Sequence, residues 1–238
     1  MGDTTNLVSA WKLDENGTTT PDAFGSNTLT ENGAVVAVTG QFGDGSHFDS
    51  TSDFWSITDA AQTGLDLTGD YSVVGWGELS NFTNGNRCFL CKSGGAGQKG
   101  WAATIDEGGH LMLRATSTFA TVSTGGMSLN TWAHMAWVLD TAADTVKYYI
   151  AGALDTTITS FTAVPSGNTA ACAIGSGDSD RSNWGLATAT NNNIDEVLLF
   201  SRVVTLTEVQ DLMNNGIDSF IGGGGGAKPS RMMMMGIQ

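Results

Sequence analysis

Basic residues are scarce in this sequence, which has 10 Lys and Arg against 24 Asp and Glu in 238 residues and a formal net charge of −14. Proteins that bind nucleic acid or anionic membranes rely on clustered Lys and Arg. The shortage therefore argues against both as partners. An acidic balance fits a soluble surface protein, and it also fits a protein that collects divalent cations. Composition alone leaves these two interpretations open.

Long apolar runs are also missing. No stretch approaches the ~20 apolar residues of a membrane-spanning helix. The first residues, M-G-D-T-T-N-L, lack the basic region and apolar core of a secretory signal. We therefore expect neither a membrane span nor a signal peptide in this sequence.

Cysteine occurs three times, which is too few for a disulfide framework. Cys88 and Cys91 have the C-x-x-C spacing of zinc ligands, but their neighbours predict a strand, in which residues three apart face opposite sides. We expect Cys88, Cys91 and Cys172 to be buried thiols that pack as small apolar side chains.

Helical periodicity is confined to one segment near the C-terminus. The 32 glycines and the abundant Thr, Asn, Ser and Asp suit many short strands joined by turns. Apolar runs and alternation predict strands at 7–13, 45–49, 54–58, 71–79, 87–92, 101–105, 111–115, 131–140, 146–151, 170–175 and 194–200. Because no helices intervene, the sequence predicts an all-β protein of two packed antiparallel sheets.

The predicted strand at 194–200 is apolar on both faces and should be internal. Alternation assigns its residues to two faces, one with Ile194, Leu198 and Phe200 and the other with Asp195, Val197 and Leu199. Asp195 would then be buried. A carboxylate taken out of water needs a cation, a metal ion or several hydrogen-bond donors.

A capped helix follows this strand. Thr205 and Glu208 form the S/T-x-x-E capping box. A helical stripe and a helix-ending pair come next, formed by Leu206, Val209, Leu212 and Met213 and by Asn215-Gly216. We expect one folded domain at residues 1–221.

Residues 222–238 have a different composition and cannot build a core. Five consecutive glycines occupy 222–226, and a run of methionines follows at Met232, Met233, Met234 and Met235. The glycines make a flexible spacer, and methionine side chains can fill an irregular groove on another subunit. A disordered end is the alternative to an assembly anchor.

The predicted strand at 131–140 is apolar on both sides, with Trp132 and His134 on one face. We interpret His134 as a packed, hydrogen-bonded core residue rather than a metal ligand or a base.

The order of these segments resembles the LamG-like jelly-roll family, the laminin-G or concanavalin A-like sandwiches, over about residues 7–217. The likeness rests on A-W-K-L-D-E-N-G (10–17), P-D-A-F-G-S-N-T-L-T (21–30), G-Q-F-G-D-G-S-H-F-D (40–49), L-D-L-T-G-D-Y-S-V-V-G-W (65–76), W-A-H-M-A-W-V (132–138), Y-Y-I-A-G (148–152), A-I-G (173–175) and N-I-D-E-V-L-L-F-S-R (193–202). It implies two curved antiparallel sheets, and a binding module more often than an enzyme.

The resemblance also implies a structural calcium ion, held where an early D-x-x-G-x-N loop meets the late I-D-E strand. The matching residues are Asp22, Asn27 and Asp195. Calcium takes six to eight oxygen ligands and would neutralise a buried Asp195. Alternatively, Asp195 caps backbone amides or pairs with Arg202.

Catalysis is not predicted. Glucanases that share this sandwich use two acids on one strand face. Asp195 and Glu196 are adjacent, so they should point in opposite directions, and Asp106-Glu107 lies in a predicted turn. With three histidines in the chain, no motif supports Ser/His/Asp chemistry either.

A polar loop at 175–185 is the predicted ligand site. Sugar sites combine an aromatic platform with hydrogen-bonding side chains. Trp184 would stack on a sugar, and hydroxyl groups or a second cation would be bound by Asp178, Asp180, Arg181 and Asn183. In the alternative interpretation Trp184 covers a sheet edge and the acids keep the loop soluble.

Together these features favour a non-catalytic virion surface protein of a phage or virus, either a capsid decoration or a tail-fibre component. Its jelly roll would bind glycans or host surfaces, and its tail would dock onto other virion subunits in an oligomeric assembly. A carbohydrate-binding module of a secreted bacterial protein, extracellular or at the cell surface, is the alternative. A glucanase-like hydrolase is a more distant one.

Overall fold

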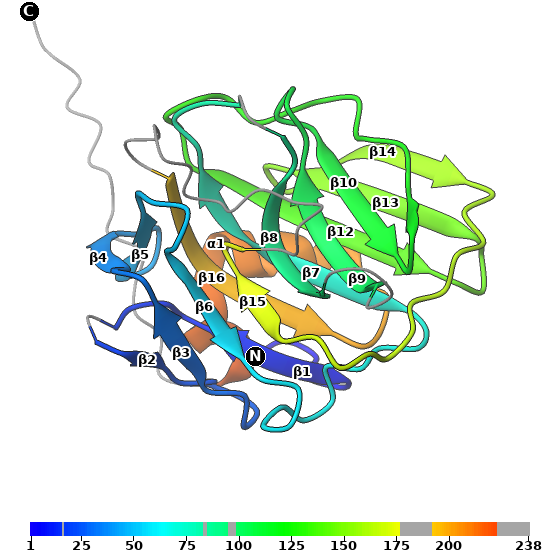
Figure 1. The fold of residues 1–238 in the computed structure, drawn as a ribbon. Helices are drawn as coiled ribbons and strands as arrows, with labels where there is room; N and C mark the ends of the chain where they lie inside the picture. The colour runs from blue at the N-terminus through cyan, green and yellow to red at the C-terminus, as the bar shows by residue number, and fades with distance from the viewer. Residues whose placement is uncertain (16, 83–84, 95–98, 177–191, 223–238) are drawn as a thin grey trace, which may run out of the picture.

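The computed structural model describes residues 1–15, 17–82, 85–94, 99–176 and 192–222, and it shows two antiparallel sheets packed face to face (Figure 1). The family's jelly-roll sandwich is therefore confirmed. No helix in the described part of the chain has the length and apolarity that a bilayer crossing requires.

Sheet A contains the central strand pair of the fold, β7 and β16. Its order is β14-β13-β12-β7-β16-β5-β4, and β1 pairs with β16 beside this path. The strands are β14 (Ala153–Thr159), β13 (Thr145–Ile150), β12 (Ala133–Asp140), β7 (Tyr71–Glu78), β16 (Asn192–Phe200), β5 (Asp44–Phe48), β4 (Val36–Thr39) and β1 (Leu7–Trp11).

Sheet B lies opposite and has the order β11-β10-β9-β8-β15-β6-β3-β2. Its strands are β11 (Thr118–Phe119), β10 (Leu111–Ala115), β9 (Lys99–Ile105), β8 (Arg87–Ser93), β15 (Cys172–Ile174), β6 (Phe54–Ile57), β3 (Leu29–Asn32) and β2 (Thr19–Thr20). All eleven strands expected from the sequence occur in one sheet or the other. The expectation missed β2, β3, β4, β11 and β14.

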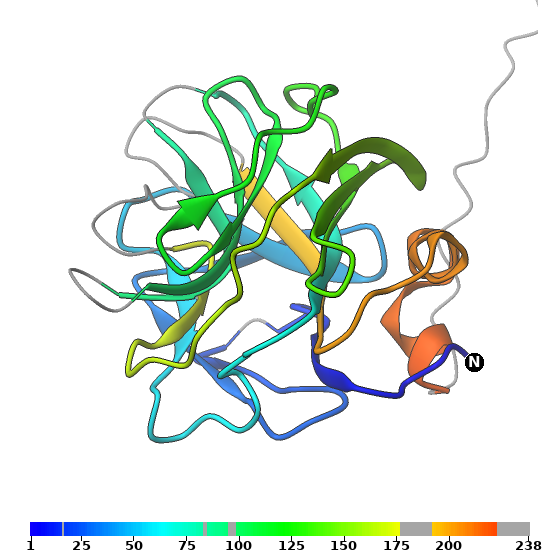
Figure 2. The same cartoon turned by 90° about the vertical axis from the view of Figure 1, so that its right-hand side faces the viewer.

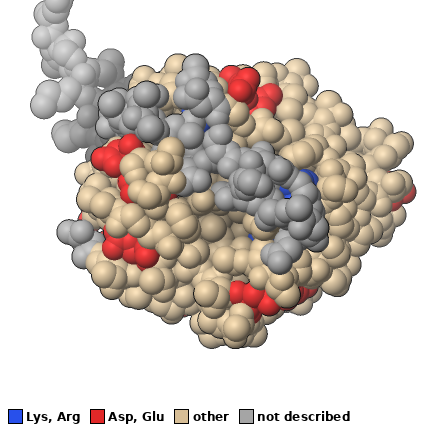
Figure 3. All heavy atoms as spheres, viewed as in Figure 1, with Lys and Arg blue, Asp and Glu red and all other residues tan. Residues whose placement is uncertain are grey.

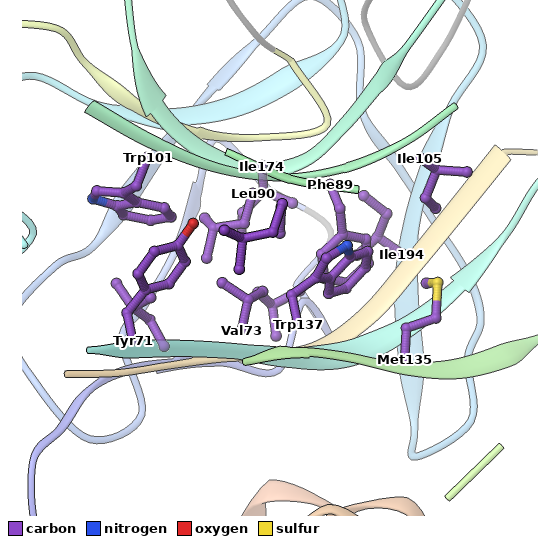
Figure 4. Close-up of a cluster of buried hydrophobic side chains, with 14 of the residues drawn as sticks. Tyr71, Val73, Phe89, Leu90, Trp101, Ile105, Met135, Trp137, Ile174 and Ile194 are labelled. Carbon is purple, nitrogen blue, oxygen red and sulfur yellow. The ribbon is translucent and has the colours of Figure 1, made fainter. Parts of the chain in front are cut away.

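The core fills the space between the sheets (Figure 4). Phe89 of sheet B stacks on Trp137 of sheet A with ring centroids 5.1 Å apart, and neither side chain is exposed. The Trp137 indole Nε1 donates to the Thr104 carbonyl at 3.1 Å. Each fully buried large apolar side chain contributes roughly 1.5–3 kcal/mol of transfer free energy. This layer therefore holds the sandwich together.

One helix, α1 (Leu206–Ile221), covers the outer face of sheet A (Figure 2). Val209 and Leu212 pack there against Val74 and Leu198. The predicted capping box is confirmed: the Thr205 hydroxyl accepts from the Glu208 amide, and the Glu208 carboxylate accepts from the Thr205 amide. This cap fixes where the helix begins.

The helix does not end at Asn215-Gly216, as the sequence suggested. Gly216 does take a left-handed φ of 69°, which kinks the helix, but helical structure resumes and ends at Gly222 with φ 82°. Ile217 and Phe220 are buried in the second segment. Their burial against sheet A explains why the chain continues past the glycine.

A β-bulge in β16 overturns the predicted face assignment. The register of β16 against β7 shifts between Asp195 and Leu198, and Glu196 has a φ of 54°. The extra residue reverses the alternation. Ile194 therefore lies in the inner core with Val197 instead of sharing a face with Leu198, which packs toward the helix.

A second bulge changes the prediction for the cysteines. The register of β8 against β9 shifts between Cys88 and Leu90. Cys88 and Cys91 consequently lie in one cluster on the same face instead of opposite faces. These two cysteines and Cys172 are buried thiols, as expected. Burial is also the main reason why the pKa of the Cys172 thiol is raised.

Carboxylates are scattered over the face of the molecule shown in Figure 3, where Lys and Arg are sparse. The acidic balance of the sequence is therefore visible at the surface rather than confined to one patch.

Candidate functional site

Asp195 lies on β16 and is fully buried. Its Oδ2 accepts hydrogen bonds from the backbone amides of Gln41 at 2.5 Å and Phe42 at 3.1 Å. The side chain thus holds the connection between β4 and β5. Of the two alternatives to a metal ion, capping of backbone amides is what the structure shows, because Arg202 forms its ion pair with Glu208 instead.

Burial raises the pKa of Asp195 to about 8, although the two amides oppose this shift. Its second oxygen, Oδ1, has no hydrogen-bond partner among the described residues. A neutral carboxyl, or a cation beside Oδ1, would relieve the cost of this buried charge.

Glu196 projects from the bulge toward helix α1, where its Oε2 accepts from the backbone amide of Ile217. The inner-face positions on either side belong to Ile194 and Val197. Asp195 and Glu196 therefore both lie on the outer face of sheet A, which corrects the expectation that they point in opposite directions. Burial, and then the neighbouring Asp195, raise the pKa of Glu196 to about 9.

A small pocket of about 80 Å³ opens beside Glu196. Lys12 lies in its wall and bridges Asp14 and Asp218, each at 3.1 Å. The Asp14 Oδ1 accepts from the Asp44 amide at 3.0 Å. In this pocket Asp14 and Asp218 are both ion-paired with Lys12, and Glu196 is hydrogen-bonded to the Ile217 amide.

Asp22 and Asn27 lie together, as the resemblance implied. The Asp22 Oδ1 accepts from the amides of Ala10, Phe24 and Gly25, and its Oδ2 accepts from the Asn27 amide. The Asn27 side chain bonds to Ser9 and to both backbone polar groups of Thr63.

The hydrogen bonds of Asp22 and Asn27 thus hold β1 and the loop at Thr63, whereas those of Asp195 hold the segment at 41–42. The described residues contain no group of three or more His, Cys, Asp or Glu that fits a metal ion. Calcium at Asp22, Asn27 and Asp195 stays a prediction.

The other predicted site residues lie outside the described part of the chain. These are the glycan-loop residues Asp178, Asp180, Arg181, Asn183 and Trp184, and the tail residues Met232, Met233, Met234 and Met235.

A polar pocket of about 320 Å³ opens on the described surface of sheet A. The described residues that line it are Gln41, Glu78, Asn130, Thr131 and Trp132. The alternation in 131–140 predicts Trp132 and His134 on one strand face, but no local pattern in the sequence indicates this pocket. The missing information was the pairing of β12 with β7, which brings the Trp132 segment beside the end of β7.

An apolar pocket of about 350 Å³ adjoins it and shares Thr131 and Trp132. Trp76 and His134 lie in its wall, edge to face, with ring centroids 5.1 Å apart. His134 is buried, which confirms the packed position predicted for it. We refer to the two pockets together as the Trp132 groove.

The sequence model of the concanavalin A-like lectin/glucanase superfamily matches residues 49–210. The chain belongs to this superfamily. No curated protein sequence gives a significant match.

Solved structures with the same fold include three of different origin. The binding domain of Paraclostridial Mosquitocidal Protein 1 has a TM-score of 0.69 at 12% identity, covering 89% of this chain and 52% of that one. Domain 4 of AbnA, a GH43 extracellular arabinanase from Geobacillus stearothermophilus in complex with arabinotriose, has 0.65 at 22%, covering 87% and 98%. Trypanosoma rangeli sialidase has 0.62 at 15%, covering 87% and 32%.

The chain thus spans about half of the mosquitocidal binding domain and about a third of the sialidase chain. At these identities the likeness establishes the fold alone. What these proteins bind is a property of those proteins.

Proposed function

We propose that this protein is a non-catalytic surface-binding protein whose jelly roll recognises glycans. The observation that carries the proposal is the Trp132 groove, where an aromatic ring adjoins neutral and acidic hydrogen-bonding side chains. Saccharides present C–H faces that stack on aromatic rings and hydroxyls that bond to amides and carboxylates. Membership in the lectin/glucanase superfamily supports the same ligand class.

The acids of the described chain favour binding over hydrolysis. Glycoside hydrolysis needs two carboxyl groups that flank the scissile bond. Glu78 is the one carboxylate among the described residues that line the groove. Asp195 and Glu196 are instead hydrogen-bonded to backbone amides of the fold. The glucanase-like alternative is therefore the weaker candidate.

The finer proposal is that the domain is displayed on a phage or virus particle, as a capsid decoration or tail-fibre component, with residues 222–238 as its anchor. The composition of that segment supports it, since a glycine spacer precedes adaptable methionine side chains. The alternative is a carbohydrate-binding module of a secreted bacterial protein. In that case the chain would not be incorporated into virus particles.

The test of the binding proposal separates binding from cleavage. The full chain is incubated with arabinotriose and with chitotriose, binding is followed by isothermal titration calorimetry, and products are followed by chromatography. Binding heat without new products is expected. Release of shorter sugars would support the hydrolase, and a Trp184→Ala variant shows whether the 175–185 loop contributes.

A further inference from the structure

The polar part of the Trp132 groove is built from three separate segments of the chain. Gln41 comes from the β4–β5 connection, Glu78 ends β7, and Asn130 to Trp132 precede β12. Two of these segments are fixed by the fold: the Asn130 amide donates to the Leu79 carbonyl at 2.8 Å, and the Gln41 amide donates to Asp195. The backbone of these two segments is therefore held in place before binding.

Glu78 is oriented by a hydrogen-bonded row across sheet A. The Asn193 Nδ2 donates to the Glu78 Oε2 at 2.7 Å, and the Asn193 Oδ1 lies 2.7 Å from the His47 Nδ1. Asn193 is paired in register with both residues, and it is buried. No described residue donates to the Glu78 Oε1. The row thus presents one carboxylate oxygen to a donor in the groove.

The second part of the groove is apolar and meets the first at Trp132. Its wall includes Trp76, Met127, Ile150 and Met213. A ring that stacks on Trp132 can therefore direct hydroxyls toward Glu78 and Gln41 while it places an apolar substituent among these side chains. Each part, at about 320 and 350 Å³, lies at the lower end of the ~300–1,000 Å³ range of small-ligand pockets.

The charge of the groove opposes acidic ligands. Its described lining contains Glu78 and neither Lys nor Arg. Two cations elsewhere in the described chain are already paired, Lys92 with Asp59 and Arg202 with Glu208. A carboxylate brought beside Glu78 would meet like charge without a compensating partner.

We propose that the Trp132 groove selects uncharged saccharides that carry a small apolar substituent, of which an N-acetylhexosamine is the simplest. The N-acetyl methyl group occupies the apolar part, and hydroxyls donate to the oriented Glu78. This inference rests on the proposed glycan-binding function and assigns it a ligand class and a location.

The test compares three monosaccharide probes, N-acetylglucosamine, glucose and N-acetylneuraminic acid, with the full chain by NMR titration and saturation-transfer difference. N-acetylglucosamine should bind about tenfold more tightly than glucose, with the strongest transfer to its methyl group, and N-acetylneuraminic acid should not bind. Trp132→Ala should weaken binding at least tenfold. Phe24→Ala, at an exposed aromatic residue away from the groove lining, is the control and should bind normally.

Glu78→Gln provides a second variant whose readout does not depend on the folding of Trp132→Ala. It should weaken N-acetylglucosamine about threefold and reduce the discrimination against N-acetylneuraminic acid. Equal affinity of the wild-type protein for the three probes would overturn the inference. Binding that requires Trp184 but tolerates both groove variants would overturn it and keep the proposed function, whereas absence of binding to any saccharide would contradict both.

Discussion

The carboxylate of Glu196 accepts a hydrogen bond from the backbone amide of Ile217, which joins the bulge of β16 to the kink of the C-terminal helix. Gly216 makes this contact possible. A Cβ at Gly216 would lie 2.9 Å from both the Glu196 Oε2 and the Phe42 ring. The kink and the bulge are therefore two halves of one contact between sheet A and helix α1.

Replacing Gly216 with alanine should destabilise the protein by about 1–3 kcal/mol, because Gly216 has a φ of 69° and no room for a Cβ. Urea unfolding monitored by tryptophan fluorescence measures the change. Gly69→Ala is the matched control, since a Cβ at Gly69 meets nothing within 4 Å. Equal losses in the two variants would contradict the role given to the kink.

The stability of the Asp195→Asn variant, relative to that of the wild-type protein, should increase as the pH rises. The folded-state pKa of Asp195 is about 8, above its ordinary value of 3.8. Between these two pH values the native state holds a proton that the unfolded state has released. The contribution of the Asp195 carboxyl to the free energy of unfolding therefore falls with rising pH, by at most about 1.4 kcal/mol per pH unit. The variant does not titrate and escapes this loss.

Unfolding free energies of both proteins at pH 5, 6, 7 and 8, without added calcium, measure the effect. The unfolding free energy of the variant minus that of the wild-type protein should increase steadily across this window. A difference that does not change with pH would show that Asp195 is ionised throughout.

If calcium binds at Asp22, Asn27 and Asp195, ionised Asp195 should stabilise the native state instead of destabilising it. A bound ion stabilises the native state by about 2.7 kcal/mol when its concentration is 100 times its Kd. The melting temperature of the wild-type protein should then rise with calcium and fall with EDTA, and Asp195→Ala should lose this response. Equal melting temperatures with and without EDTA would remove the ion from the account.

Deletion of residues 222–238 should abolish incorporation into particles while leaving the sandwich folded, because the last residue of helix α1, Ile221, precedes the deleted segment. Circular dichroism checks the fold, and sedimentation of purified particles checks incorporation. Replacement of the four methionines at 232–235 by serine separates the contribution of their side chains from that of the glycine spacer. Normal incorporation of the deletion variant would contradict the anchoring proposal.

Much of the fold followed from apolar patterning, because the long central strands are apolar on one or both faces. The strand β14 (Ala153–Thr159) was missed since it lies at the edge of sheet A and is largely exposed, with little apolar pattern. The bulges after Asp195 and Cys88 were also missed. Both lie in strands apolar on either side, where a shift of one residue changes which apolar side chain faces inward without breaking the pattern.

The candidate site likewise contains one feature that the sequence indicated and one that it did not. The sequence indicated a buried Asp195 that needs hydrogen-bond donors, and the structure supplies them from Gln41 and Phe42. The Trp132 groove could not be predicted, because Glu78 and Trp132 meet through strand pairing between distant segments. Local sequence patterns carry no information about that pairing.

The most direct measurement of the central claim is binding of the labelled full-length chain to a glycan microarray, in parallel with Trp132→Ala and Phe24→Ala. The wild-type and Phe24→Ala proteins should bind uncharged glycans with exposed N-acetyl groups, and Trp132→Ala should lose that binding. An array on which the wild-type chain binds no glycan would contradict the central claim.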